Sequence, residues 1–179
     1  MANEPTKAEF DKPAETDELH LSRTVDAPRD VLFKVWIEAE HFAQWFGPRG
    51  VDVPSCKLDP RPGGILHFCH RRDDGTEVWV KGTYREVVAP ERLVFSLWFV
   101  DVDGHAAPPP MFPDWPPDTT MLTTVTFADL GGKTQLTVRQ GFLPRGATAN
   151  EVVRRVREGA QAGWGETLDR LAEYVSTRP

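Results

Sequence analysis

The chain has 179 residues, of which 40% are hydrophobic and 27% charged, and it includes six Trp and ten Phe. This length suits one domain, and the aromatic content predicts a bulky core or an aromatic-lined cavity. The formal net charge of −6, without a basic block, argues against nucleic acid as a partner and against electrostatic docking on membranes.

The N-terminal segment, residues 1–17, is polar and acidic and shows no periodicity, so we predict a disordered tail. It lacks the pattern of a signal peptide, and no apolar stretch approaches the roughly 20 residues that cross a bilayer. Cys56 and Cys69 lack the spacing of a zinc site and are interpreted as reduced thiols. We therefore expect a cytoplasmic protein with a single domain over residues 18–179.

The domain is predicted to begin with a strand and two short helices. Apolar and polar residues alternate over residues 19–25, and the Ala27-Pro28 pair that follows favours a helix start. Helical spacing then covers residues 29–37, and a second helical piece covers residues 39–46.

Next come strands separated by turn residues, which predict an antiparallel meander. Six segments have this character: 51–58, 65–71, 77–88, 92–100, 121–127 and 134–140. Before the last two lies an insertion, residues 101–118, with six prolines in eighteen residues. Such a composition forbids a helix or an inner strand. Because the insertion also carries Phe112 and Trp115, it either packs on the domain or acts as a lid.

A long amphipathic helix is predicted at the C-terminus. Thr148 and Glu151 fit a capping box, and apolar residues then recur at steps of three and four. This stripe consists of Val153, Val156, Ala160, Trp164, Leu168, Leu171 and Val175. Gly163 and Gly165 are interpreted as sites of close packing against the sheet. A group of arginines, Arg154, Arg155 and Arg157, is interpreted as a solvated face rather than a phosphate site.

This order of elements predicts an α+β domain of two layers, in which the long C-terminal helix packs against one face of a seven-stranded antiparallel sheet. No triad, metal or phosphate-loop pattern is present, and we predict neither a metal nor a cofactor.

Several short motifs, in order and spacing, extend over about residues 19–176. They are Ala27-Pro28, Gln44-Trp45-Phe46-Gly47-Pro48, Pro62-Gly63-Gly64, the run from Gly82 to Phe95, Gly141-Phe142, and Gly163-Trp164 with Leu168, Asp169, Leu171, Ala172 and Tyr174. Together they resemble the SRPBCC or START-like (birch-pollen-allergen-like) helix-grip superfamily, and more closely its branch of homologues of the activator of the heat-shock protein ninety ATPase. The resemblance implies a helix-grip fold, in which the seven-stranded sheet curves and wraps around the long C-terminal helix. It also implies a hydrophobic cavity where helix and sheet diverge. Some relatives bind hydrophobic ligands, and the eukaryotic ones assist a chaperone.

The implied fold and the alternation of the strands suggest which side chains line the cavity. The candidates are Trp36, Trp45, Phe46, Leu66, Phe68, His70, Val80, Tyr84, Phe95, Trp98, Phe112, Trp115, Trp164 and Leu168. For the strand at 92–100, either the set that contains Phe95 or the set that contains Trp98 faces inward, and the sequence does not decide between them. The aromatic side chains of residues 36–46 are interpreted first as core that plugs the open end of the fold, and second as cavity lining.

Three functions are compatible with these features. We favour a non-catalytic protein, monomeric or homodimeric, that binds a hydrophobic or aromatic small molecule. One alternative is a chaperone partner, which rests on the resemblance alone. The other is an enzyme similar to a polyketide cyclase or hydrolase, in which His70 and Tyr84 would act. His70 is interpreted either as a polar anchor or general base, or as a partly solvated residue at a strand end.

Overall fold

Residues 18–144 and 146–178 are described by a computed structural model of the protein. The tail predicted at residues 1–17 lies outside these residues. Within the described part, the elements are β1 (Leu19–Val25), α2 (Arg29–Ile37), α3 (Ala39–Trp45), β2 (Val51–Leu58), β3 (Ile65–Arg72), β4 (Glu77–Val88), β5 (Arg92–Val100), β6 (Thr120–Asp129), β7 (Thr134–Leu143), the 3-10 turn η1 (Ala147–Ala149) and α4 (Glu151–Ser176). The predicted order is confirmed.

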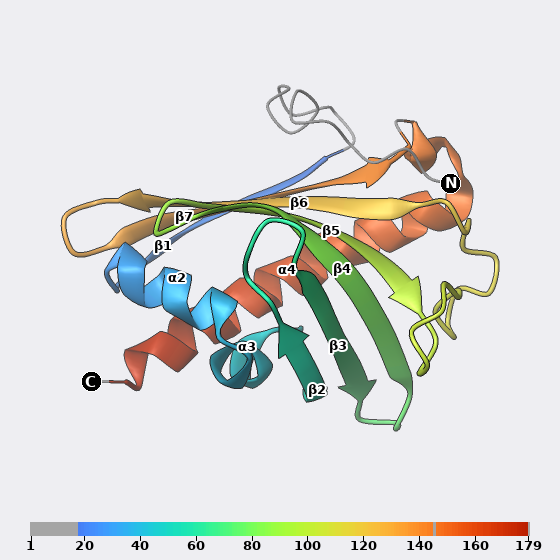
Figure 1. The fold of residues 1–179 in the computed structure, drawn as a ribbon, viewed down its shortest axis with the longest axis horizontal. Coiled ribbons are helices and arrows are strands. Elements are labelled where there is room, and N and C mark those ends of the chain that lie inside the picture. The colour runs from blue at the N-terminus through green and yellow to red at the C-terminus, as the bar shows by residue number, and fades with distance from the viewer. Residues whose placement is uncertain (1–17, 145, 179) are drawn as a thin grey trace.

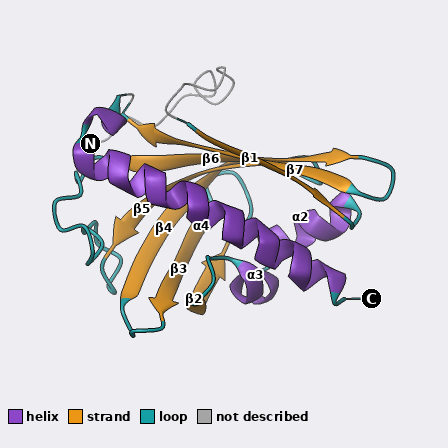
Figure 2. Cartoon of the chain, turned by 180° about the vertical axis from the view of Figure 1, so that it is seen from behind, coloured by secondary structure: helices purple, strands orange, loops and turns teal. Residues whose placement is uncertain are grey.

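The seven strands form one antiparallel sheet in the order β1-β7-β6-β5-β4-β3-β2. The sheet curves, and α4 runs across its concave side (Figures 1 and 2). The short helices α2 and α3 lie beside the C-terminal half of α4. This arrangement confirms the predicted helix-grip fold.

The hairpin of β6 and β7 is longer than its sequence pattern predicted. Thr120 pairs with Leu143 at one end of the hairpin, and Asp129 pairs with Thr134 at the other. Pairing with a neighbouring strand therefore extends each strand beyond the alternating residues from which it was predicted.

The start of α4 differs from the predicted capping box of Thr148 and Glu151. Asn150 is the N-cap, and its side-chain oxygen accepts hydrogen bonds from the backbone N–H groups of Val152 (2.9 Å) and Val153 (3.3 Å). Thr148 lies in η1, before the helix. The capping-box prediction was wrong because Asn caps as well as Thr and stands directly before the first helical residue.

Aromatic rings fill the end of the fold that α2 and α3 cover. Trp36 is 1% exposed and its ring lies 4.8 Å from that of Trp45 and 6.1 Å from that of Phe127. Trp45 donates a hydrogen bond from Nε1 to the Val35 carbonyl at 3.1 Å. Edge-to-face pairs add roughly 0.5–1.5 kcal/mol each to the burial of the rings. This cluster makes one end of the domain solid core.

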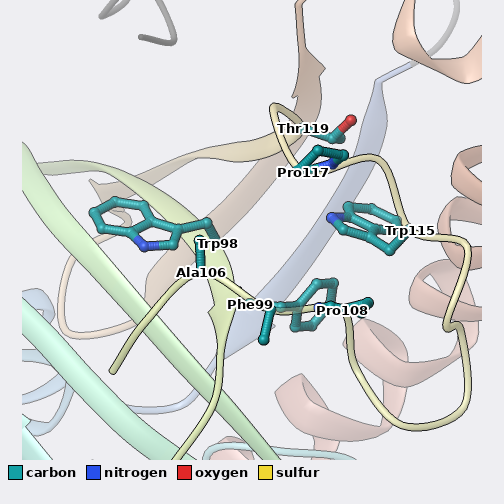
Figure 3. Close-up of a pocket in the computed structure, with 8 residues that line it drawn as sticks. Trp98, Phe99, Ala106, Pro108, Trp115, Pro117 and Thr119 are labelled. Atoms are coloured by element: carbon teal, nitrogen blue, oxygen red, sulfur yellow. The ribbon is translucent and has the colours of Figure 1, made fainter. Parts of the chain in front are cut away.

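The proline-rich insertion packs on the body of the domain. Trp115 is 6% exposed, and its ring lies 5.1 Å from Phe99 and 6.3 Å from Phe142. A space of about 50 Å³ remains between the insertion and β5, bordered by Trp98 and Trp115 (Figure 3). Such a volume suits a water molecule rather than a larger ligand.

The inward face of β5 is the one that contains Leu93, Phe95 and Leu97, all of which belong to the hydrophobic core. The opposite set also has buried members, including Val94 at 0% exposure, which explains why alternation alone could not choose. No helix in the described residues is long and apolar enough to span a membrane.

Candidate functional site

A cavity of about 470 Å³ lies between α4 and the concave face of the sheet. Small-molecule pockets commonly have volumes of this order. The cavity is lined by Phe46, Gly47, Pro48, Phe68, His70, Arg72, Val80, Leu97, Phe99, Phe112, Met121, Gln140, Arg155, Val156, Gly159, Ala160, Gly163, Trp164 and Thr167. Most of these side chains are apolar, and five carry aromatic rings of Phe or Trp.

The helix contributes its smallest residues to this cavity. A Cβ atom placed on Gly159 or Gly163 would meet no atom of another part of the structure within 4 Å. The interpretation of Gly163 as a close-packing site was therefore wrong, because it borders open space. Gly165 has only an ordinary contact, 3.7 Å to Arg23 Nη2. The apolar stripe of α4 leaves the sheet at this point, so Val156 and Ala160 are only half-buried.

One wall of the cavity is fixed by a series of buried hydrogen bonds between side chains. Trp164 donates from Nε1 to Gln140 Oε1 at 3.2 Å, and Gln140 donates from Nε2 to Thr123 Oγ1 at 3.0 Å. The Trp164 ring also stacks on Trp36, with 6.2 Å between centroids and 16° between planes. Because Gln140 is only 4% exposed, these paired groups hold the wall in one conformation.

A second wall, residues 46–48, is tied to α4 by Arg170. Its Nη1 donates to the carbonyls of Gly47 (2.8 Å), Pro48 (3.0 Å) and Val51 (3.1 Å), and its Nη2 donates to Gln44 (3.3 Å). One guanidinium thus accepts no bond itself but donates to backbone carbonyls that have no helical partner because α3 ends at Trp45. Arg170 could not be predicted as a wall residue, because in the sequence an arginine off the apolar stripe of a helix looks like a surface residue.

The backbone at Gly47 requires glycine. Its φ is +133°, and a Cβ there would lie 3.2 Å from Val51 Cγ1 and 3.3 Å from His70 Nε2. The helical piece was predicted to end at residue 46, directly before this glycine, and the structure adds that Gly47 brings the chain against His70.

His70 stands on β3 among aromatic rings, 5.6 Å from Phe46 and 5.1 Å from Phe68. Its Nε2 is buried and has no hydrogen-bond partner in the described structure. The pKa of His70 is lowered from 6.5 to about 4, mainly by burial; a backbone hydrogen bond with Phe46 opposes this lowering, and the positive charge of Arg170 adds to it. At neutral pH the imidazole is therefore uncharged.

The rim of the cavity carries two arginines, Arg72 at the end of β3 and Arg155 on α4. The Arg155 guanidinium lies 5.9 Å from the centre of the Phe112 ring, which belongs to the proline-rich insertion. Arg155 is exposed, as expected for a solvated helix face, and its side chain also borders the cavity.

The structure separates the residues suggested from the sequence into three groups. Those that line the cavity are Phe46, Phe68, His70, Val80, Phe112 and Trp164. Trp98 and Trp115 border the smaller space beneath the insertion. Buried in the core are Trp36, Trp45, Leu66, Tyr84, Phe95 and Leu168. Alternation identified the inward faces of β3 and β4 but not that of β5, and the position where the helix leaves the sheet depends on tertiary packing.

Tyr84 illustrates this difference. It is 1% exposed, its ring lies 6.1 Å from Phe95, and burial raises the pKa of its hydroxyl above the usual value. The structure therefore does not bring Tyr84 and His70 together on the cavity wall.

Comparison with known proteins agrees with this architecture. The family model described as "Activator of Hsp90 ATPase homolog 1-like protein" matches residues 26–176. No curated protein matches the chain.

Three solved structures show the same fold. A protein from Arthrobacter aurescens has a TM-score of 0.75 at 20% identity, with 93% of this chain and 90% of that one covered. A protein from Mycobacterium smegmatis has a TM-score of 0.74 at 18% identity, with 92% and 93% covered. The AHSA1 protein from Silicibacter pomeroyi has a TM-score of 0.69 at 20% identity, with 90% and 99% covered.

Proposed function

Because this chain belongs to the family of Activator of Hsp90 ATPase homolog 1-like proteins, a helix-grip family, we propose that it binds a small molecule with an apolar body in the cavity between α4 and the sheet. The observation that carries the proposal is the cavity itself, about 470 Å³ with a mostly apolar and aromatic lining. Removing apolar ligand surface from water would supply the binding free energy, at roughly 25 cal/mol per Å².

The cavity walls support binding without large rearrangement. Trp164 is held by Gln140, and the segment that carries Phe46 is held by Arg170. A pocket that keeps its shape without a ligand loses less conformational freedom on binding, which favours affinity.

Binding is favoured over catalysis by the chemistry of the lining. The pair suggested for an enzyme is split, since His70 lines the cavity and Tyr84 lies in the core. The His70 Nε2 is enclosed by protein, so in this conformation it is closed to a substrate. We propose that His70 shapes the wall as a neutral group.

The test fills the cavity without removing any wall contact. Gly163→Leu would place a side chain in the open space, and Gly165→Leu is the matched control two residues away that does not line the cavity. Nile red fluorescence would report binding of an apolar probe, and urea unfolding would report stability. We expect Gly163→Leu to weaken Nile red binding at least tenfold without loss of stability, whereas Gly165→Leu retains binding. No binding to the original protein, or equal binding to both variants, would contradict the proposal.

The family description also names a chaperone ATPase, which makes a chaperone partner the second candidate. The two candidates differ in a direct assay: the ATPase rate of the host's own Hsp90-type chaperone, measured with and without this protein. The binding proposal expects no change in that rate, and a clear stimulation would favour the chaperone role.

A further inference from the structure

The charges around the cavity differ from those of the whole protein. The chain has 27 acidic and 21 basic residues, giving a net charge of −6. Among the described residues that line the cavity, two are arginines and none is Asp or Glu. An acidic protein thus presents a cationic mouth to whatever enters this cavity.

The two arginines are placed to act at the mouth rather than in the interior. Arg72 continues the inward face of β3 that contains Phe68 and His70, and it is exposed at the strand end. Arg155 is exposed on α4, four residues before Gly159. Both side chains therefore stand between the apolar interior and solvent.

Neither guanidinium forms an ion pair with a described residue, although the charge of Arg72 contributes to lowering the pKa of Asp74 in the next turn. Other arginines near this face are engaged: Arg154 pairs with Glu158 at 2.7 Å, and Arg170 is held by backbone carbonyls. The contact that Arg155 makes is with the ring of Phe112, which holds its guanidinium at the rim.

The interior of the cavity has no charged group that could bind the charged end of a ligand in place of the rim arginines. His70 is neutral at neutral pH, and the Gln140 amide is already paired with Trp164 and Thr123. A charged group would lose hydration in such surroundings without gaining an opposite charge. An amphipathic ligand would consequently place its apolar body inside and its polar end at the arginines.

We propose that the ligand is an amphipathic anion, an apolar chain or ring system that ends in a carboxylate, with Arg72 and Arg155 binding the carboxylate at the mouth. This inference rests on the proposed function, because it assigns the chemical class of the molecule in the same cavity. Guanidinium groups suit it, since they present several N–H donors that match the two oxygens of a carboxylate.

The experiment compares three probes with the same chain and different ends: decanoate, decanol and decyltrimethylammonium. Calorimetric titration at neutral pH and low salt is expected to show decanoate binding about tenfold more tightly than decanol, with the cation weakest. Added salt should reduce the preference for decanoate, because the arginines are exposed and screened.

Substitutions test whether the two rim arginines cause the preference for decanoate. The double substitution Arg72→Met and Arg155→Met keeps the apolar stems and removes both charges, so decanoate should fall to the affinity of decanol, while decanol changes less than twofold. Arg154→Met is the matched control, one residue away and outside the cavity, and it should keep the preference.

The outcomes separate the two proposals. Three results would overturn the proposal of an anionic ligand and leave the cavity as an apolar binding site. They are equal affinity for decanoate and decanol, a preference for decanoate that survives the double substitution, and a preference that disappears in Arg154→Met. Failure of all three probes to bind would remove the binding function as well.

Discussion

Acidification is expected to destabilise this protein through His70. The folded state lowers the pKa of His70 from 6.5 to about 4 because its ring is enclosed by Phe46, Phe68 and the Gly47 backbone. Between those two pH values the unfolded chain binds a proton at this position and the folded protein does not. Stability due to the neutral imidazole is therefore complete above about pH 6.5 and is lost as the pH falls toward 4.

The magnitude follows from the size of the pKa change. One pKa unit corresponds to about 1.4 kcal/mol, so the loss reaches about 3 kcal/mol once the pH is near 4. A typical domain has a free energy of unfolding of roughly 5–15 kcal/mol. A single histidine thus accounts for a substantial part of the acid sensitivity expected here.

Urea unfolding from pH 7 to pH 4, measured on the original protein and on His70→Phe, isolates this contribution. Other titrating groups are common to both proteins and cancel in the difference. The free energy of unfolding of the original protein should fall by about 3 kcal/mol relative to the variant over this range. A difference that stays constant with pH, or an NMR titration of the His70 ring with a pKa near 6.5, would show that His70 does not cause this loss of stability.

Three further predictions concern stability measured by urea unfolding. Arg170→Met should cost about 3 kcal/mol, because it leaves several backbone carbonyls without their donor, and Arg170→Lys should recover only part of this since an ammonium cannot span them. Asn150→Ala should cost about 1 kcal/mol through loss of the helix cap, whereas Asn150→Asp should be nearly neutral. Gly163→Ala should stabilise by about 0.5–1 kcal/mol, because the added methyl enters open space within a helix.

Each of these predictions has an outcome that would count against the structure described here. A neutral Arg170→Met would mean that the segment at residues 46–48 is held in another way. Equal losses in Asn150→Ala and Asn150→Asp would place the cap elsewhere. A destabilising Gly163→Ala would show that this part of α4 packs closely against its neighbours.

The sequence was a good guide to the elements because local signals and tertiary structure agree there. The alternation in β4 and the Ala27-Pro28 helix start lie where the sequence pattern placed them. The start of α4 was misjudged, since Thr148 and Asn150 both suit a cap and the hydrogen bonds decide between them.

The cavity was harder to predict because it depends on how far α4 stands from the sheet, which the pattern of apolar residues does not give. Trp164 and Leu168 belong to one stripe of α4, yet only Trp164 borders the cavity. Gly163, which favoured close packing when considered in the sequence alone, faces open space. Arg170 and Gln140 gave no signal, since their roles depend on partners far away in the chain.

A crystal of the protein soaked in decanol would show directly whether the cavity takes up an apolar molecule. We expect electron density for the alkyl chain in the cavity, against Gly163 of α4 and between Phe46, Phe99 and Trp164, with the wall residues unmoved. A cavity filled by the protein's own side chains, or decanol found only on the outer surface, would rule out the proposed binding site.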